Sequence, residues 1–130
     1  MRLLNKIIIH CSDSNHPDHG KDVIDDWHRD RGFSEIGYHY LITKEKIEIC
    51  RDIHKIPASA KGHNTGSIAI CLAGKDNFTD RQFFLLKTLI RLLQGIFKIP
   101  DVAIYNHYEL NPNKTCPNFD VRAIIGYDHD

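Results

Sequence analysis

The sequence predicts an α/β protein: a single domain, residues 1–130, with a central mixed β-sheet of about five strands flanked by helices. The chain has 130 residues, which is enough for one domain with its own hydrophobic core. Short apolar runs rich in isoleucine alternate along the chain with segments of helical periodicity. Such alternation is typical of helices packed against one sheet.

The expected strands are apolar segments bounded by turn-forming residues. Residues 6–11 contain three consecutive isoleucines, so this strand is expected to be buried on both faces. Residues 44–46 are expected to form the turn between two strands, and Gly74 closes a later apolar run. The five expected strands are residues 6–11, 38–43, 47–50, 67–72 and 102–105.

Three helices are expected, two between these strands and one after the last of them. Asp22 and Asp25 can cap the first, which should end near Gly32. Thr79 and Gln82 have the spacing of a capping box, and the long helix that follows should reach about Lys98 before Pro100. A last short helix is expected from residue 118 onward. Residues 107–117 contain two prolines and no apolar periodicity, so they are interpreted as a loop.

Composition excludes several classes of function. Lys and Arg number 17, as do Asp and Glu, and a protein that holds a nucleic-acid backbone usually carries a basic surplus. The most apolar stretch, residues 83–97, is interrupted by two basic residues, so no membrane span is expected. The N-terminus shows no signal-peptide pattern. We therefore expect a monomer that binds neither nucleic acid nor membrane and stays cytoplasmic until it is released.

Three side chains could form a metal site. His10 follows the isoleucine run at the end of the first strand, His107 follows the strand that ends at Tyr105, and Cys116 lies in the loop just after His107. Residues at strand ends point into the crevice where α/β proteins bind ligands. Two imidazoles and a thiolate suit zinc and leave a fourth position for water. Each residue also has an ordinary alternative, because a single His is more often structural and a single Cys more often a small buried residue.

Comparison along the whole chain adds a resemblance to a known family. The chain resembles the zinc N-acetylmuramoyl-L-alanine amidases of tailed phages and prophages, the type 2 amidases, which are related to the animal peptidoglycan-recognition proteins. The matching segments keep their order and span almost the entire chain. They are IIHCS at 8–12, WHR at 27–29, GF at 32–33, GYHY at 37–40, AKGHN at 60–64, SIAICLAG at 67–74, HYE at 107–109 and KTCPNFD at 114–120.

The resemblance implies an amidase fold, an endolysin-like activity and a set of site residues. It implies one zinc ion bound by His10, His107 and Cys116, with Tyr38 and Lys114 as catalytic residues. The implied reaction cleaves the amide bond between the lactyl group of N-acetylmuramic acid and L-alanine in peptidoglycan or muropeptides. Two alternatives stay open: a non-catalytic module that recognises peptidoglycan, and a regulator that binds a polymerase. Residues 111–113 make the loop before Cys116 one residue longer than in the phage relatives.

Several other residues carry explicit expectations. His63 and Asn64 lie in a glycine-containing loop that could line a substrate groove. Cys11 is expected to point into the core on the face opposite His10, and His28 is expected at the surface. The remaining expectations are a core position for Cys71, a half-buried one for Cys50, a structural or ligand-orienting role for His39, and solvated positions for His16, His19, His54 and His129.

Overall fold

The computed structural model of the chain describes residues 2–14, 19–32 and 35–126; His16 and His129 lie outside this part. Five strands form one sheet in the order β3-β2-β4-β1-β5. Only β2 and β3 pair antiparallel; the other neighbours are parallel. The predicted mixed sheet is thus confirmed. The strands are β1 Lys6–Cys11, β2 Tyr40–Ile42, β3 Ile47–Ile49, β4 Ser67–Leu72 and β5 Ile104–Asn106.

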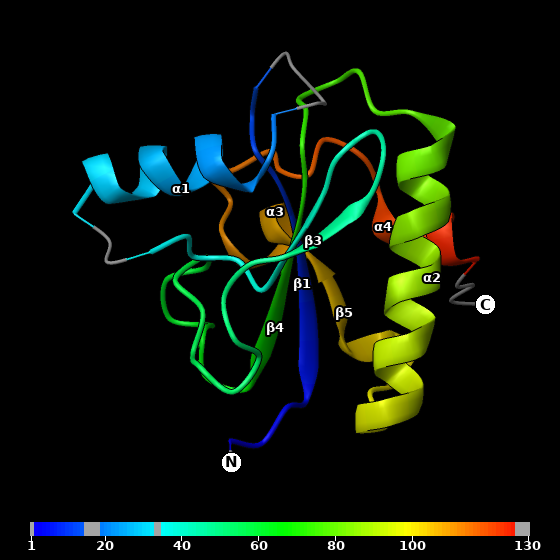
Figure 1. Cartoon of the computed structure of the whole chain (residues 1–130). Helices are drawn as coiled ribbons and strands as arrows, with labels where there is room; N and C mark the ends of the chain where they lie inside the picture. The colour runs from blue at the N-terminus through cyan, green and yellow to red at the C-terminus, as the bar shows by residue number, and fades with distance from the viewer. Residues whose placement is uncertain (1, 15–18, 33–34, 127–130) are drawn as a thin grey trace.

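Helices cover the sheet on both faces (Figure 1). The long helix α2 (Asp80–Phe97) and the short α4 (Val121–Ile125) pack on one face, where they share a core cluster with alternate residues of β1 and β4. Helix α1 (Lys21–Asp30) lies on the other face, where Ile24 packs with Leu41 and Cys71. The continuous apolar sequences of β1 and β4 follow from this three-layer arrangement, because both faces of these strands are buried.

The long helix begins as predicted. The Thr79 side chain accepts a hydrogen bond from the Gln82 backbone, and the Gln82 side chain accepts one from the Thr79 backbone. The amide nitrogen of Gln82 also donates to the carbonyls of Ile42 and Ala73 at 3.0 and 2.8 Å. The capping box therefore fixes the helix start to the ends of β2 and β4. The helix ends at a left-handed Lys98, two residues before Pro100.

Three local predictions were wrong. Helix α1 follows Gly20, which has no side chain to cap it, and Asp25 lies inside the helix, where it accepts a hydrogen bond from the Ile36 backbone. Residues 107–117, predicted as a loop, begin with the short helix α3 (His107–Leu110), which an Asn106–Glu109 capping box starts. The strand predicted at 102–105 begins only at Ile104, since residues 101–103 form a 3-10 turn.

His39 has a structural role. Its side chain is fully buried, and Nδ1 accepts a hydrogen bond from the Ala69 backbone at 3.0 Å. Nε2 therefore carries the proton and donates it to the Lys55 carbonyl at 2.8 Å. A neutral imidazole thus links β4 to the chain that follows β3.

We expect stability to fall in acid partly because of His39. Burial lowers the pKa of His39 to about 4 from its ordinary 6.5. Between these values the unfolded chain binds the proton and the folded one does not, so the free energy of unfolding falls as pH drops from 6.5 to 4. The loss should approach about 3 kcal/mol. Urea unfolding from pH 7 to 4.5 should show a shallower pH slope for His39→Asn than for the wild type; equal slopes would contradict this assignment.

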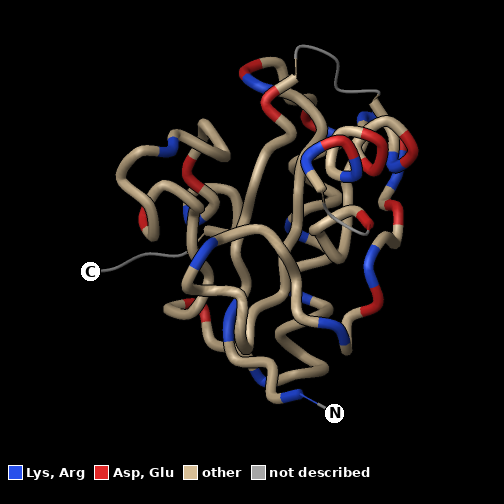
Figure 2. Tube along the Cα trace, turned by 90° about the vertical axis from the view of Figure 1, so that its left-hand side faces the viewer, with Lys and Arg blue, Asp and Glu red and all other residues tan. Residues whose placement is uncertain are grey.

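Charge is distributed without a dominant sign. Lys and Arg residues are interspersed with Asp and Glu over much of the chain (Figure 2). In the part of the chain that the structure describes, no helix combines the length and the apolar character needed to cross a membrane.

Candidate active site

Two histidines meet at the carboxyl ends of adjacent parallel strands. His10 lies in β1, and His107 begins α3 directly after β5, which pairs with β1. Their Nδ1 atoms are 3.1 Å apart and their ring centroids 4.5 Å apart. Burial lowers the pKa of both imidazoles, and each is lowered further by neighbouring charge. Both rings are therefore neutral at pH 7 and keep a lone pair available for a ligand.

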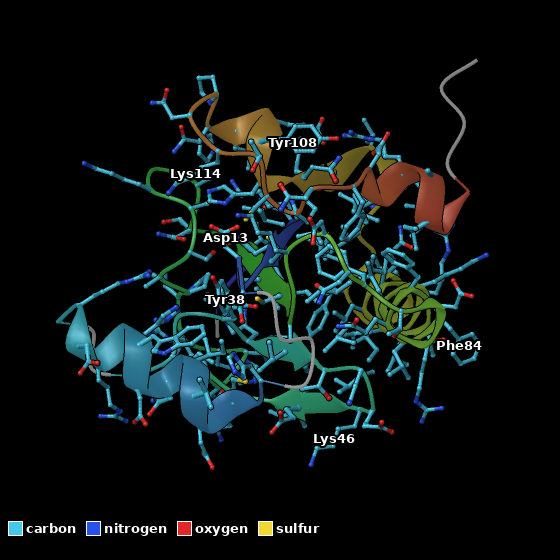
Figure 3. All side chains as sticks on the ribbon, turned by 90° about the horizontal axis from the view of Figure 1, so that it is seen from above. Asp13, Tyr38, Lys46, Phe84, Tyr108 and Lys114 are labelled. Atoms are coloured by element: carbon cyan, nitrogen blue, oxygen red, sulfur yellow. The ribbon has the colours of Figure 1, made fainter. Side chains whose placement is uncertain are left out.

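The histidine pair opens into a cavity of about 730 Å³ at this end of the sheet. Figure 3 looks onto this end and labels Tyr38, Asp13 and Lys114, all of which line the cavity. The lining contains three Lys or Arg side chains and one Asp side chain. Because the positive charges outnumber the negative one, the cavity favours a ligand that carries negative charge. These charged residues are Arg31, Lys61, Lys114 and Asp13.

A buried amide holds His107 in place. The neighbouring Asn106 is fully buried, and its Nδ2 donates to the carboxylates of Glu109 and Asp120 at 2.8 and 3.1 Å. Its Oδ1 accepts a hydrogen bond from the Val121 backbone at 2.8 Å. Asn106 thus joins the starts of α3 and α4, which fixes the point where His107 leaves the sheet.

Cys116 reaches the same cavity but contacts another cysteine. Its Sγ lies 2.7 Å from the Sγ of Cys11, and both residues line the cavity. The hydrogen bond from Cys11 lowers the pKa of Cys116 to about 7, which makes its thiolate available near neutral pH. In the described ranges, no three His, Cys, Asp or Glu side chains are grouped closely enough to hold a metal ion.

The burial predicted for Cys11 is confirmed, but Cys11 lines the same cavity as His10. Only 3% of the Cys11 surface is exposed, and the loop around Cys116 covers its side chain. Cys116 approaches the Cys11 carbonyl, and the Asn118 side chain approaches the Cys11 sulfur. Strand alternation gives the face of a side chain and not what covers that face. Cys71 and Cys50 are buried and half-buried as predicted.

Tyr38 lies beside the histidine pair. Its ring centroid is 5.2 Å from that of His10 and 5.2 Å from that of His28. Burial raises the pKa of Tyr38 well above its ordinary value. The residue is therefore a neutral phenol, able to donate a proton in a hydrogen bond.

The surface position expected for His28 was wrong. Only 6% of the residue is exposed, it lines the cavity, and its Nδ1 accepts a hydrogen bond from the Gly37 backbone at 2.8 Å. Burial lowers its pKa. Helical periodicity could have indicated the burial of His28, because this residue lies four positions after Ile24, on the apolar side of α1.

The other predicted site residues differ in how near the cavity they lie. Lys114 and Asn64 line it. The Asn64 Oδ1 accepts hydrogen bonds from the backbones of Ser59 and Ala60, at 3.1 and 2.9 Å, so Asn64 also shapes its own loop. His63 is not among the lining residues, although it is near enough to His107 to lower that residue's pKa.

A family model supplies the deciding comparison. The model described as Amidase_2, N-acetylmuramoyl-L-alanine amidase, matches residues 2–119. The chain belongs to the N-acetylmuramoyl-L-alanine amidase family. As a member of this family it is a hydrolase that cleaves an amide bond of the bacterial cell wall.

Individual amidases and related folds agree with this assignment. The endolysin of Enterobacteria phage K11 is 30% identical over 131 residues, which cover 93% of this chain and 85% of that protein. N-acetylmuramoyl-L-alanine amidase LysC from Clostridium intestinale URNW is 26% identical, with a TM-score of 0.85 over 98% of this chain and 88% of LysC. A complex of peptidoglycan recognition proteins LCa and LCx bound to tracheal cytotoxin shares the fold, with 22% identity and a TM-score of 0.77 over 88% of this chain and 75% of that one.

Proposed function

We propose that this amidase cleaves the bond between the lactyl group of N-acetylmuramic acid and the L-alanine of the stem peptide, with a zinc ion bound by His10, His107 and Cys116. The observation that carries the proposal is the facing pair of histidine Nδ1 atoms, 3.1 Å apart, in a cavity that Tyr38, Lys114 and Cys116 also line. Intact peptidoglycan and soluble muropeptides both contain this bond.

The donor set fits zinc in chemistry and in the spacing of the histidines. Two nitrogens on one tetrahedral zinc, each about 2.05 Å from the metal, would lie about 3.3 Å apart, close to the 3.1 Å between the two Nδ1 atoms. The third ligand would be the Cys116 thiolate, which must exchange its contact with Cys11 for the metal. When bound, a zinc ion with three protein ligands makes a water molecule nucleophilic near neutral pH.

Tyr38 and Lys114 would act on the charge that develops during the reaction. Attack on the amide carbonyl places a negative charge on its oxygen, which fixed hydrogen-bond donors and cations stabilise. Tyr38, whose ring packs against His10, would donate its neutral hydroxyl to that oxygen or to the departing amine. The Lys114 ammonium supplies positive charge at the cavity wall. Asn64, with His63 near it, would contact the sugar or the peptide.

Mass spectrometry of cell-wall digests tests this function. Purified peptidoglycan should release peptides with a free L-alanine amino terminus and leave intact N-acetylmuramic acid. A chelator should stop the release, and added zinc should restore it. Cleavage within the glycan or within the peptide would overturn the assigned bond, and undiminished cleavage by protein shown to contain no metal would overturn the zinc dependence.

A peptidoglycan-recognition module without catalysis is the second candidate, because recognition proteins share this fold. The same digest separates the two functions. A recognition module would bind peptidoglycan in a pull-down assay and release no peptide with zinc present.

We infer that, in the cell, the amidase acts on the wall after release from the cytoplasm.

A further inference from the structure

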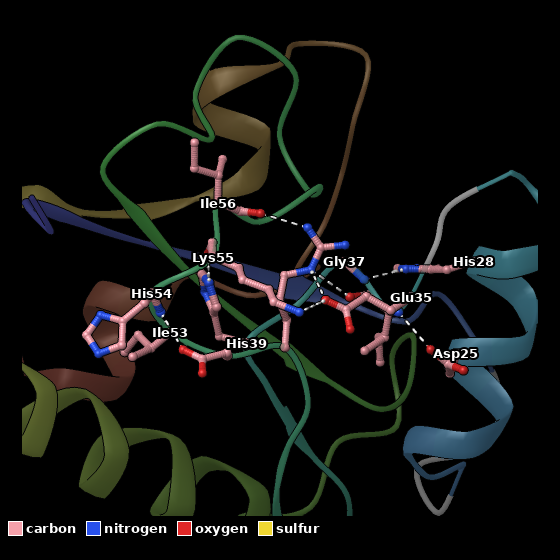
Figure 4. A network of polar contacts seen from close by, with 12 residues as sticks. Asp25, His28, Glu35, Gly37, His39, Ile53, His54, Lys55 and Ile56 are labelled. Carbon is pink, nitrogen blue, oxygen red and sulfur yellow. Dashed lines mark hydrogen bonds and ion pairs between the residues drawn. The ribbon is translucent and has the colours of Figure 1, made fainter. Parts of the chain in front are cut away.

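Side chains of α1 hold the two peptide groups that precede Tyr38 (Figure 4). Asp25 Oδ1 accepts a hydrogen bond from the Ile36 backbone nitrogen at 2.7 Å. His28 Nδ1 accepts one from the Gly37 backbone nitrogen at 2.8 Å. Asp25 and His28 are three residues apart on the helix, so they lie on the same side. The backbone N–H groups of two consecutive residues, Ile36 and Gly37, thus donate to two side chains on the same side of α1.

The opposite side of the same segment is also fixed. Arg51 Nε donates to the Ile36 carbonyl at 3.0 Å, and the Ala58 backbone nitrogen donates to the Gly37 carbonyl at 3.0 Å. A Cβ atom at Gly37 would lie 2.2 Å from the Ala58 carbonyl oxygen, so there is no space for the segment to move that way. All four backbone polar groups of Ile36 and Gly37 therefore have partners, two of them from α1.

This arrangement determines where the next side chain points. The Tyr38 ring packs 5.2 Å from the His28 ring and 5.2 Å from the His10 ring. His28 therefore contacts Tyr38 twice, through the Gly37 peptide group and through its own ring. A hydrophobic residue could fill the same volume, but it would leave the buried Gly37 N–H without an acceptor, which is costly.

We propose that Asp25 and His28 are positioning residues of the amidase reaction, which fix the Tyr38 hydroxyl in the cavity through the backbone of Ile36 and Gly37. The inference rests on the proposed function, because that function gives Tyr38 its role. Neither residue needs to touch the reacting atoms. Catalysis depends on groups held to within a fraction of an ångström, and a displacement of about 1 Å can reduce the rate by about 100-fold.

Two matched substitutions of His28 isolate the hydrogen bond. His28→Asn keeps an acceptor oxygen near the position of Nδ1, whereas His28→Gln places its amide near the position of Nε2 and leaves the Gly37 N–H without an acceptor. We expect His28→Gln to lower kcat about 10- to 100-fold with little change in KM, and His28→Asn to retain most of kcat. If His28→Gln does not fold, Asp25→Asn and Asp25→Leu make the same comparison at Ile36, and Arg29→Gln controls for the loss of the exposed Asp25–Arg29 ion pair.

A double-mutant cycle with Tyr38→Phe decides whether these residues act through Tyr38. In the Tyr38→Phe background, His28→Gln should lower kcat by no more than about twofold, because the hydroxyl that it positions is gone. An undiminished effect in that background, or a raised KM with unchanged kcat, would overturn the positioning role. Full kcat in Tyr38→Phe alone would overturn the role of Tyr38 in the proposed function, and this inference with it, so the two failures are distinguishable.

Discussion

Replacing Cys116 by alanine is expected to abolish zinc binding and cell-wall hydrolysis together. The substitution removes the proposed thiolate ligand, whose pKa of about 7 lets it ionise near neutral pH. Two imidazoles alone bind zinc more weakly, and an alanine methyl cannot replace the lost negative charge. Elemental analysis of the dialysed protein measures the metal content, and peptide release from peptidoglycan measures the activity. Stoichiometric zinc with full activity in Cys116→Ala would contradict the ligand assignment.

The other cysteines provide the controls for this experiment. Cys50 is half-buried and is not among the residues that line the cavity, so Cys50→Ala should keep both zinc and activity. Cys11 lies 2.7 Å from Cys116 and is the only sulfur described there that could replace it. Cys11→Ser should retain zinc. Loss of zinc in Cys11→Ser together with retention in Cys116→Ala would assign the thiolate ligand to Cys11 instead.

The sheet could be predicted from the sequence because the burial of its central strands is visible in the residues of each strand alone. The residues of β1 and β4 are buried on both faces, so their sequences are continuous apolar runs that no exposed strand would tolerate. The start of α2 was equally visible, because the Thr79–Gln82 capping box is made within one turn. The first helix was predicted, but its cap was wrong, since the helix already begins after Gly20 and Asp25 lies inside it, bonded to the Ile36 backbone.

The active site could be predicted only in part because it depends on strand order. The sequence indicated that His10 and His107 lie at the ends of strands, but not that β1 and β5 are neighbours. That pairing brings residues 97 positions apart within 3.1 Å. His28 was misplaced, and the segment that covers Cys11 was not foreseen, for a related reason. Periodicity shows which face a side chain occupies, whereas the segments that cover the face, here Tyr38 over His28 and the Cys116 loop over Cys11, come from elsewhere in the chain.

Replacing Tyr38 by phenylalanine is expected to lower kcat by about 100- to 1000-fold, the usual cost of losing one fixed hydrogen-bond donor to a developing oxyanion. The substitution removes one oxygen and keeps the ring that packs against His10 and His28, so the zinc content should not change. Because burial holds the phenol neutral, the wild type should keep this donor throughout the range in which the enzyme is folded. KM should change little, since the donor acts mainly in the transition state.

Tyr40→Phe is the matched control for Tyr38→Phe. Tyr40 also has a half-buried ring, but it packs against the core cluster under α2 and is not among the residues that line the cavity. Its loss of a hydroxyl should leave kcat unchanged. A similar slowing in both variants would point to a general loss of stability, whereas wild-type kcat in Tyr38→Phe would show that the oxyanion is stabilised elsewhere in the cavity. In that case Lys114, the other proposed donor at the wall, becomes the residue on which stabilisation of the transition state depends.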